Sequence, residues 1–393
     1  MSVVQRLPLE QAEEDRAQRK ELSHADALRA VTERLTHQRI LSKVPLFILG
    51  AGISNKRVPS LADIGWWLHQ RLAELSEEIV DRDRWIMDHA SRLVDEDASR
   101  RQASELFSAL QKTVEPFYSI WNDFSSGFLL DGLDLDPSGW PSRFPGLCSG
   151  EVEPTDAHWA LATLLQQSEA YVMSLNFDGL TYRALTACGK AGVALHSERQ
   201  IRDYFAADVK ERLPAVIKIR GDVFSAQCEG TACPSAHESY PLDRFRGPQD
   251  RSLMCPVCKQ ARLRLQFYFP GSRAKEEAAA SMLWEVRRFL GNRLSALIIV
   301  GLSGRWDRYL LRFLFDFAKE RGLLVVDVKP DDKRCGALID DFRRLYYPSI
   351  PSMTDVSDSS RAQGARFVRI KAEANEFIPR IAALPIPAQG GSH

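Results

Sequence analysis

Short polar segments that follow the apolar runs of this chain carry residues suited to binding and catalysis. The segments are Gly50-Ala51-Gly52-Ile53-Ser54, Asn176-Phe177-Asp178, Arg220-Gly221-Asp222, Gly301-Leu302-Ser303 and Asp327-Val328-Lys329. Glycines let a backbone approach a phosphate closely, while amides and carboxylates can bind the hydroxyls of a ribose. Together the segments indicate a nucleotide site. Taken singly, each also fits loop polarity or helix capping, which Asp178 and Ser303 would provide to the helices after them.

The first segment has a specific local pattern. The apolar run 44–49 leads directly into Gly50 and Gly52, as a buried strand leads into a phosphate-binding loop. Both glycines lack a Cβ, so the backbone here can adopt positive φ angles, and its N–H groups can approach a pyrophosphate closely. The third glycine of the usual dinucleotide motif is missing, and an ordinary tight turn fits a lone Gly-x-Gly equally well.

Apolar runs alternate with amphipathic segments along most of the chain. The runs lie at 44–49, 170–175, 215–219, 296–300, 323–328 and 366–370. Strands that alternate with helices need crossover connections, which produce a parallel sheet with helices on both faces. We therefore predict an α/β fold with a Rossmann-like, doubly wound sheet of six parallel strands. Ligands of such sheets bind beyond the carboxyl ends of the strands, so the polar segments should converge there.

The same patterns divide the chain into segments. The Rossmann-like domain is predicted to comprise residues 44–59 and 151–384, with a helical insertion at 60–150. The helical segment at 1–43 is amphipathic, which suits packing on the main domain or on another subunit. Residues 385–393 are expected to form a flexible tail.

Four of the seven cysteines gather in one glycine- and proline-rich segment. They are Cys228, Cys233, Cys255 and Cys258. They form two pairs, Cys-x4-Cys and Cys-Pro-Val-Cys, and each pair can hold one side of a tetrahedral zinc ion. We therefore predict a structural zinc module at 225–268, inserted in the Rossmann-like domain. The alternative is a β-hairpin that carries unligated thiols.

Composition limits the classes of partner. The 393 residues include 52 lysines and arginines and 52 aspartates and glutamates, so no overall field draws the chain to nucleic acid or an anionic membrane. The apolar runs are too short to span a bilayer, and the first residues lack the apolar region of a signal peptide. We expect a cytoplasmic protein with no membrane contact and no direct nucleic-acid binding.

The ordered motifs resemble those of the sirtuin (silent information regulator) family. They are Gly50-Ala-Gly-Ile-Ser54, Pro154-Thr-Asp-Ala-His158, Ser174-Leu-Asn-Phe-Asp178, Lys218-Ile-Arg-Gly221, the four cysteines and Gly301-Leu-Ser303. The segment Gly301-Leu-Ser-Gly-Arg-Trp-Asp307 looks more like the divergent bacterial sirtuin-like domains than like the protein deacylases. The resemblance implies a domain that binds NAD and cleaves its nicotinamide–ribose bond. In many divergent members this reaction is NAD hydrolysis in antiphage defence, in an assembly that often includes a partner ATPase, and a homo-oligomer is a further expectation.

The resemblance also implies roles for individual residues. Asn176 matches the asparagine that holds the ribose and positions a water, and Asp178 matches the acid that supports it. The predicted NAD-binding residues are Gly50, Ala51, Gly52, Ile53, Ser54, Asn176, Asp178, Gly221, Asp222, Gly301, Ser303 and Asp327.

Arg220 departs from the family pattern, because it stands where the family has a general-base histidine. Arginine stays protonated and has no acceptor atom, so it cannot take up a proton. Either Arg220 binds an anion while His196 or Asp222 acts as base, or an aligned water needs little base help, or the domain only binds its ligand. The first prediction is a NAD hydrolase with the catalytic candidates Asn176, Asp178, His196 and Arg220; a NAD- or ADP-ribose-binding scaffold is the alternative, and a protein deacylase is third. His196 follows a short strand, and we expect it either in the cleft or, more simply, in a surface loop.

Overall fold

The computed structural model describes residues in three stretches of the chain, at 29–58, 152–330 and 367–383, with gaps inside the first two. The described residues are 29, 31–35, 37, 43–54, 57–58, 152–167, 170–189, 192–208, 212–228, 230–234, 239–241, 254–261, 263–267, 273–302, 308–330 and 367–383. The predicted helical insertion at 60–150 and the tail at 385–393 lie outside them, as does most of the N-terminal segment.

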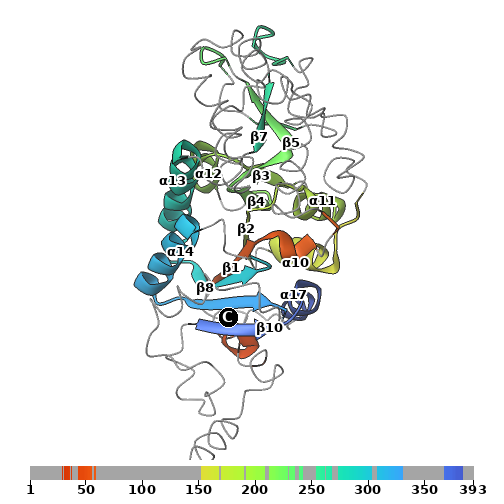
Figure 1. Cartoon of the computed structure of the whole chain (residues 1–393), viewed down its shortest axis with the longest axis vertical. Helices are drawn as coiled ribbons and strands as arrows, with labels where there is room; N and C mark the ends of the chain where they lie inside the picture. The colour runs from red at the N-terminus through yellow and green to blue at the C-terminus, as the bar shows by residue number, and fades with distance from the viewer. Residues whose placement is uncertain are drawn as a thin grey trace, which may run out of the picture.

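A parallel sheet of seven strands forms the centre of the described structure (Figure 1). Its strands, in spatial order, are β10 (Phe367–Lys371), β9 (Leu324–Lys329), β8 (Leu294–Val300), β1 (Val44–Leu49), β2 (Tyr171–Ser174), β4 (Ala215–Lys218) and β3 (Val193–Leu195). Every neighbouring pair is parallel. The predicted α/β class and all six predicted strands are confirmed. The seventh strand, β3, is the short strand expected before His196; it has three residues at the sheet edge and was not counted among the six strands of the predicted sheet.

Helices cover both faces of this sheet. On one side lie α12 (Glu198–Ala206), α13 (Arg273–Leu290) and α14 (Arg308–Arg321), and on the other lie α10 (Asp156–Gln166), α11 (Leu180–Ala187) and α17 (Ala374–Ala382) (Figure 1). Successive side chains of β1 enter different cores: Leu46 and Ile48 join the core beneath α13 and α14, whereas Phe47 and Leu49 join the core beneath α10 and α17. Burial of both faces explains why β1 reads as an unbroken apolar run.

A second, antiparallel sheet lies beyond the β3 edge of the first (Figure 1). It comprises β6 (Ser239–Pro241), β5 (Gly221–Cys228) and β7 (Leu263–Phe267), with β5 in the middle. Only two residues separate β4 from β5, and Gly221 makes the change of direction with a φ of +71°. Such a φ suits glycine, because it lacks a Cβ. The polar turn after β4 therefore also begins the cysteine-bearing sheet.

None of the described helices combines the length and the apolar character that a membrane crossing requires.

Candidate functional site

The glycine turn after β1 is shaped by contact with another loop and not by unusual torsion angles. Gly50 and Gly52 are absent from the positive-φ glycines of the described structure, so they do not use the conformational freedom that glycine offers, whereas Gly301, after β8, has a φ of +65°. A Cβ added to Gly50 would lie 2.6 Å from the Gly301 carbonyl oxygen, and one added to Gly52 would lie 2.6 Å from the Gly301 Cα. Glycine is needed here because two backbones meet.

Most backbone N–H groups of this turn donate hydrogen bonds to other backbone atoms of the protein. The N–H of Gly50 donates to Val300 O at 2.9 Å, and that of Gly52 donates to Gly301 O at 3.0 Å. The N–H of Ile53 donates to Gly50 O at 3.2 Å. The N–H groups of the two glycines are therefore not available to a pyrophosphate in this arrangement. Ala51 is half-buried and Gly52 is exposed, so they form the accessible part of the helical turn η1 (Ala51–Ser54).

The loop after β2 meets this turn through two side chains. Asn176 Nδ2 donates to Gly50 O at 3.1 Å, and Ser54 Oγ donates to Asp178 Oδ2 at 3.2 Å. Asp178 Oδ1 also accepts from Leu180 N, the first residue of α11, at 3.0 Å, although the N-cap position itself is occupied by Gly179. Asn176 is half-buried, whereas Ser54 and Asp178 are buried. The structure thus brings together two of the five segments from which the nucleotide site was predicted.

Lys218, to which the sequence analysis assigned no role, is part of the same cluster. It is the last residue of β4 and is buried, and its Nζ donates to the carbonyl oxygens of Asn176 at 2.7 Å and Asp178 at 2.6 Å. The signal in the sequence was a lysine at the end of an apolar strand, next to the polar turn that begins at Arg220.

The side chains of His196, directly after β3, and Asp222, near the start of β5, form a buried pair. His196 Nε2 lies 3.1 Å from Asp222 Oδ2, and the two side chains are 1% and 5% exposed. The prediction of a surface histidine is therefore wrong. Burial by itself would raise the pKa of Asp222, but the hydrogen bond with His196, the charge of Lys218 and the amide of Phe224 at 2.8 Å hold it below its usual value. Asp222 is therefore ionised.

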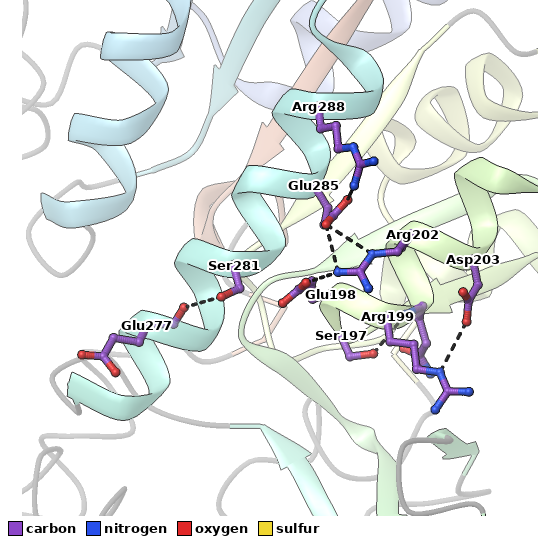
Figure 2. A network of polar contacts seen from close by, with 10 residues as sticks. Ser197, Glu198, Arg199, Arg202, Asp203, Glu277, Ser281, Glu285 and Arg288 are labelled. Atoms are coloured by element: carbon purple, nitrogen blue, oxygen red, sulfur yellow. Dashed lines mark hydrogen bonds and ion pairs between the residues drawn. The ribbon is translucent and has the colours of Figure 1, made fainter.

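The helix after His196 is fixed to its neighbour by charged side chains (Figure 2). Ser197 caps α12 by accepting from Gln200 N at 3.2 Å, and the Gln200 side chain accepts from His196 N at 2.7 Å. Arg202, also on α12, donates to Glu285 of α13 at 3.1 and 3.3 Å. The position of His196 is thus set by the packing of α12 on α13.

The remaining predicted residues fall in different places. Arg220 is buried in the two-residue turn between β4 and β5, and Gly221 is the first residue of β5. Ser303 lies outside the described residues. Asp327 is buried on β9, where Arg369 Nε donates to it at 2.9 Å and Lys329 Nζ lies 3.7 Å away. Because β8 separates β9 from β1, Asp327 does not join the cluster around Asn176.

The four predicted metal ligands do come together. The Sγ atoms of Cys228, Cys233, Cys255 and Cys258 all lie within 4.8 Å of one another. The pairs Cys228–Cys258 and Cys233–Cys255 are 3.7 and 3.8 Å apart. A tetrahedral zinc with Zn–S bonds of about 2.3 Å requires sulfur atoms about 3.8 Å apart, so the cluster fits this ion.

One thiol of the cluster already ionises readily. Burial opposes ionisation of Cys255, but the amides of Cys258 and Val257 and the Tyr240 hydroxyl lower its pKa to about 6. A thiolate is the form that binds zinc. With four sulfur ligands the site would be closed, so zinc would act here in folding and not in catalysis.

Comparison with known proteins gives only distant likenesses. No family model and no curated protein matches the chain. Among solved structures it is similar to an ADP-ribose complex of a Sir2 homologue mutant, with 15% identity, a TM-score of 0.40, and coverage of 88% of this chain and 94% of that one. It is also similar to a complex of Sir2 with a p53 peptide and NAD+ (15% identity, TM-score 0.39, coverage 88% and 95%) and to a Sir2 homologue–NAD complex (16%, 0.35, 64% and 73%). At this distance the interpretation of the site rests on its own residues.

Proposed function

We propose that this chain binds NAD at the carboxyl edge of β1, β2 and β4 and hydrolyses its nicotinamide–ribose bond. The observation that carries the proposal is the meeting of Asn176 and Asp178 with the turn at 50–54, through the Asn176–Gly50 and Ser54–Asp178 hydrogen bonds. Loops that converge at the carboxyl edge of a doubly wound sheet are the usual place for a nucleotide. The resemblance of the ordered motifs to sirtuins supports NAD as this nucleotide.

The main requirement of this reaction is that the site positions the ribose and the attacking water. Cleavage of the N-glycosidic bond develops positive charge at the ribose C1′, so the site must hold the sugar and direct a water at one face. Asn176 suits this role because an amide donates and accepts without titrating, and its side chain is half-buried beside the turn. Buried Asp178 holds the loop through Ser54 and Leu180.

The proton of the attacking water has to leave without Arg220. The His196–Asp222 pair, which lies after β3 and near the start of β5, is one candidate acceptor. Both side chains are buried, however, which favours the simpler alternative that an aligned water traps the cationic carbon with little base help. Arg220, as a cation, would then bind an anionic group of the ligand.

The biological setting that we propose rests on the motif resemblance alone. It is a cytoplasmic effector of antiphage defence that is activated in an assembly, as a homo-oligomer or beside a partner ATPase. The cysteine cluster would hold a structural zinc ion in the second sheet.

The test is turnover of etheno-NAD, whose fluorescence rises when nicotinamide is released. We expect the full chain, alone or with a neighbouring ATPase, to give a signal, and Asn176→Ala to lower the rate by about 100-fold, as loss of one group that orients the reacting atoms does. Arg199→Met, an exposed change on α12, is the control and should keep the wild-type rate. Equal rates for Asn176→Ala and wild type would rule out the assigned role.

A second function, ligand binding without turnover, is favoured by one observation. Arg220 stands where a proton acceptor is expected, and it is buried. Binding of ADP-ribose measured by calorimetry, together with no etheno-NAD signal under either condition, would support a scaffold or sensor. An acetyl-lysine peptide assay tests the third alternative, protein deacylation.

A further inference from the structure

Lys218 is a buried lysine whose bonds all point to one loop. Its exposed fraction is 3%. Lysine is almost never buried so fully unless it is paired, because removing its charge from water is costly. The two hydrogen bonds from Nζ, at 2.7 Å to Asn176 O and 2.6 Å to Asp178 O, offset this cost. The function of Lys218 should therefore be sought in the loop to which it is hydrogen-bonded.

Carboxylates from two different elements face this lysine. Burial lowers the pKa of Lys218, whereas Asp222 of β5 and Asp178 of the loop after β2 act in the opposite direction. The pKa of His158, on α10, is also affected by the charges of Asp178 and Lys218. Lys218 is therefore under the electrostatic influence of groups on β5 and the loop after β2, while its hydrogen bonds go to that loop alone.

The two carbonyls that Lys218 binds belong to the residues whose side chains meet the glycine turn. Asn176 is held through its side chain by Gly50 and through its carbonyl by Lys218. Asp178 is held through its side chain by Ser54 and through its carbonyl by Lys218. Only Phe177 separates them, so the loop is fixed to β1 on one side and to β4 on the other. Rotation of either residue would break a contact on both sides.

We propose that Lys218 is a positioning residue that fixes Asn176 and Asp178 in the orientation needed to hold the ribose of NAD. It acts through the backbone of the loop and does not itself touch the ligand. The proposal rests on the NAD site proposed above, but the state of the loop can be measured without any ligand.

The first measurement is amide hydrogen exchange in the full chain. Lys218→Met keeps the length of the side chain and removes its donors, so we expect exchange at Asn176 and Leu180 to rise by about tenfold or more, as loss of hydrogen bonds from a charged group predicts. Lys218→Arg should restore much of the protection. If Lys218→Met does not fold, Lys218→Gln, with a shorter donor, should show an intermediate rise. Leu283→Ala, in the core beneath α13, controls for a general loss of stability.

The second measurement is ADP-ribose affinity by calorimetry, with etheno-NAD turnover beside it. We expect Lys218→Met to weaken binding by about tenfold and to slow turnover more than Leu283→Ala does, and Lys218→Arg to recover most of both. Wild-type exchange and wild-type affinity in Lys218→Met would overturn the proposal, as would equal effects in Leu283→Ala. If the wild type binds neither ADP-ribose nor NAD, the proposed function fails, and the exchange data alone decide whether Lys218 fixes the loop.

Discussion

His158 shows how a single buried residue makes stability depend on pH. Its Nδ1 lies 3.2 Å from Thr155 N and 2.7 Å from Thr155 Oγ1, whereas its Nε2 has no hydrogen-bond partner within the described part of the chain. Burial lowers the pKa of His158 to about 4; Asp178 opposes this, and Lys218 and Arg57 add to it. A charged His158 ring would add a second buried cation that the positive charge of Lys218 repels.

We expect His158 to destabilise the protein in mild acid. The folded-state pKa of about 4 lies below the ordinary value of 6.5, so the unfolded chain binds the proton first and stability falls as the pH drops from 6.5 toward 4. At a pH of about 5 the loss would be about 2 kcal/mol relative to a pH of about 7. Urea unfolding of wild type and His158→Gln at both values measures it.

The comparison between the two chains isolates His158 from other titrating groups. His158→Gln keeps an acceptor for Thr155 N but cannot be protonated, so its stability should change less between the two pH values. His37→Gln, a change of an exposed histidine, should behave as the wild type. The same acid sensitivity in His158→Gln and wild type would show that another group is responsible.

Residue types at the site could be predicted from the sequence, but the reasons for them could not. Asn176, Asp178 and the glycine turn were placed together because strand ends of a parallel sheet share an edge. The close approach of Gly301 to Gly50 and Gly52 is a tertiary contact with no local signal. The burial of His196 likewise depends on Asp222, which lies 26 residues further along the chain.

At the scale of elements, α12 is a short helix that needs an anchor. Its nine residues follow a three-residue edge strand, so local structure alone holds His196 weakly. The Arg202–Glu285 pair supplies a link to the longer α13 (Figure 2). The Glu285 side chain is 10% exposed and that of Arg202 is 47% exposed, so water only partly screens the pair.

We expect this pair to be coupled by about 1 kcal/mol, toward the upper end for partly exposed ion pairs. A double-mutant cycle with Arg202→Met and Glu285→Gln, followed by urea unfolding, measures the coupling. The matched control is Arg199→Met with Asp203→Asn, a pair on the same helix whose side chains are 66% and 68% exposed. Its coupling should be below about 0.5 kcal/mol. If the two cycles gave equal coupling energies, the proposal that Glu285 anchors α12 to α13 would be wrong.

The elements themselves were largely predictable. Six of the seven strands of the parallel sheet have apolar runs long enough to be assigned to it, whereas β3 was visible only as a short strand before His196 and was not assigned to the sheet. The antiparallel sheet was indicated only by its cysteines, because β5 to β7 carry mixed polar and apolar residues without a continuous run. A small sheet of this kind is therefore recognised in a sequence by its potential metal ligands and not by its hydrophobic pattern.

At the scale of the whole molecule, one strand joins the site to the cysteine cluster. β5 begins at Gly221, next to Asp222 of the buried pair, and ends at Cys228. At a rise of about 3.3 Å per residue, these two ends are about 20 Å apart. The cysteine cluster has its own small core with Tyr240 and Leu263, separate from the two cores of the parallel sheet. The second sheet therefore has little apolar packing to replace a lost metal.

Loss of zinc should accordingly unfold the second sheet and spare the first. We expect the wild type to hold about one zinc per chain, as four cysteines at tetrahedral spacing require, and Cys255→Ser to hold almost none. Hydrogen exchange in Cys255→Ser should rise across β5 and β7, while β1 and β8 remain protected. Cys188→Ser, a change of an exposed cysteine outside the cluster, should keep both zinc and protection.

The outcome distinguishes a module from a mere hairpin with thiols. Zinc content is read by elemental mass spectrometry and exchange by peptide mass spectrometry on the same samples. A zinc-free wild type with a protected β5 would support unligated thiols, because the strand would then hold its fold without a metal. Loss of protection in β1 together with β5 would instead show that the two sheets unfold as one unit, with the turn at 219–221 transmitting the change to Lys218 and the loop it holds.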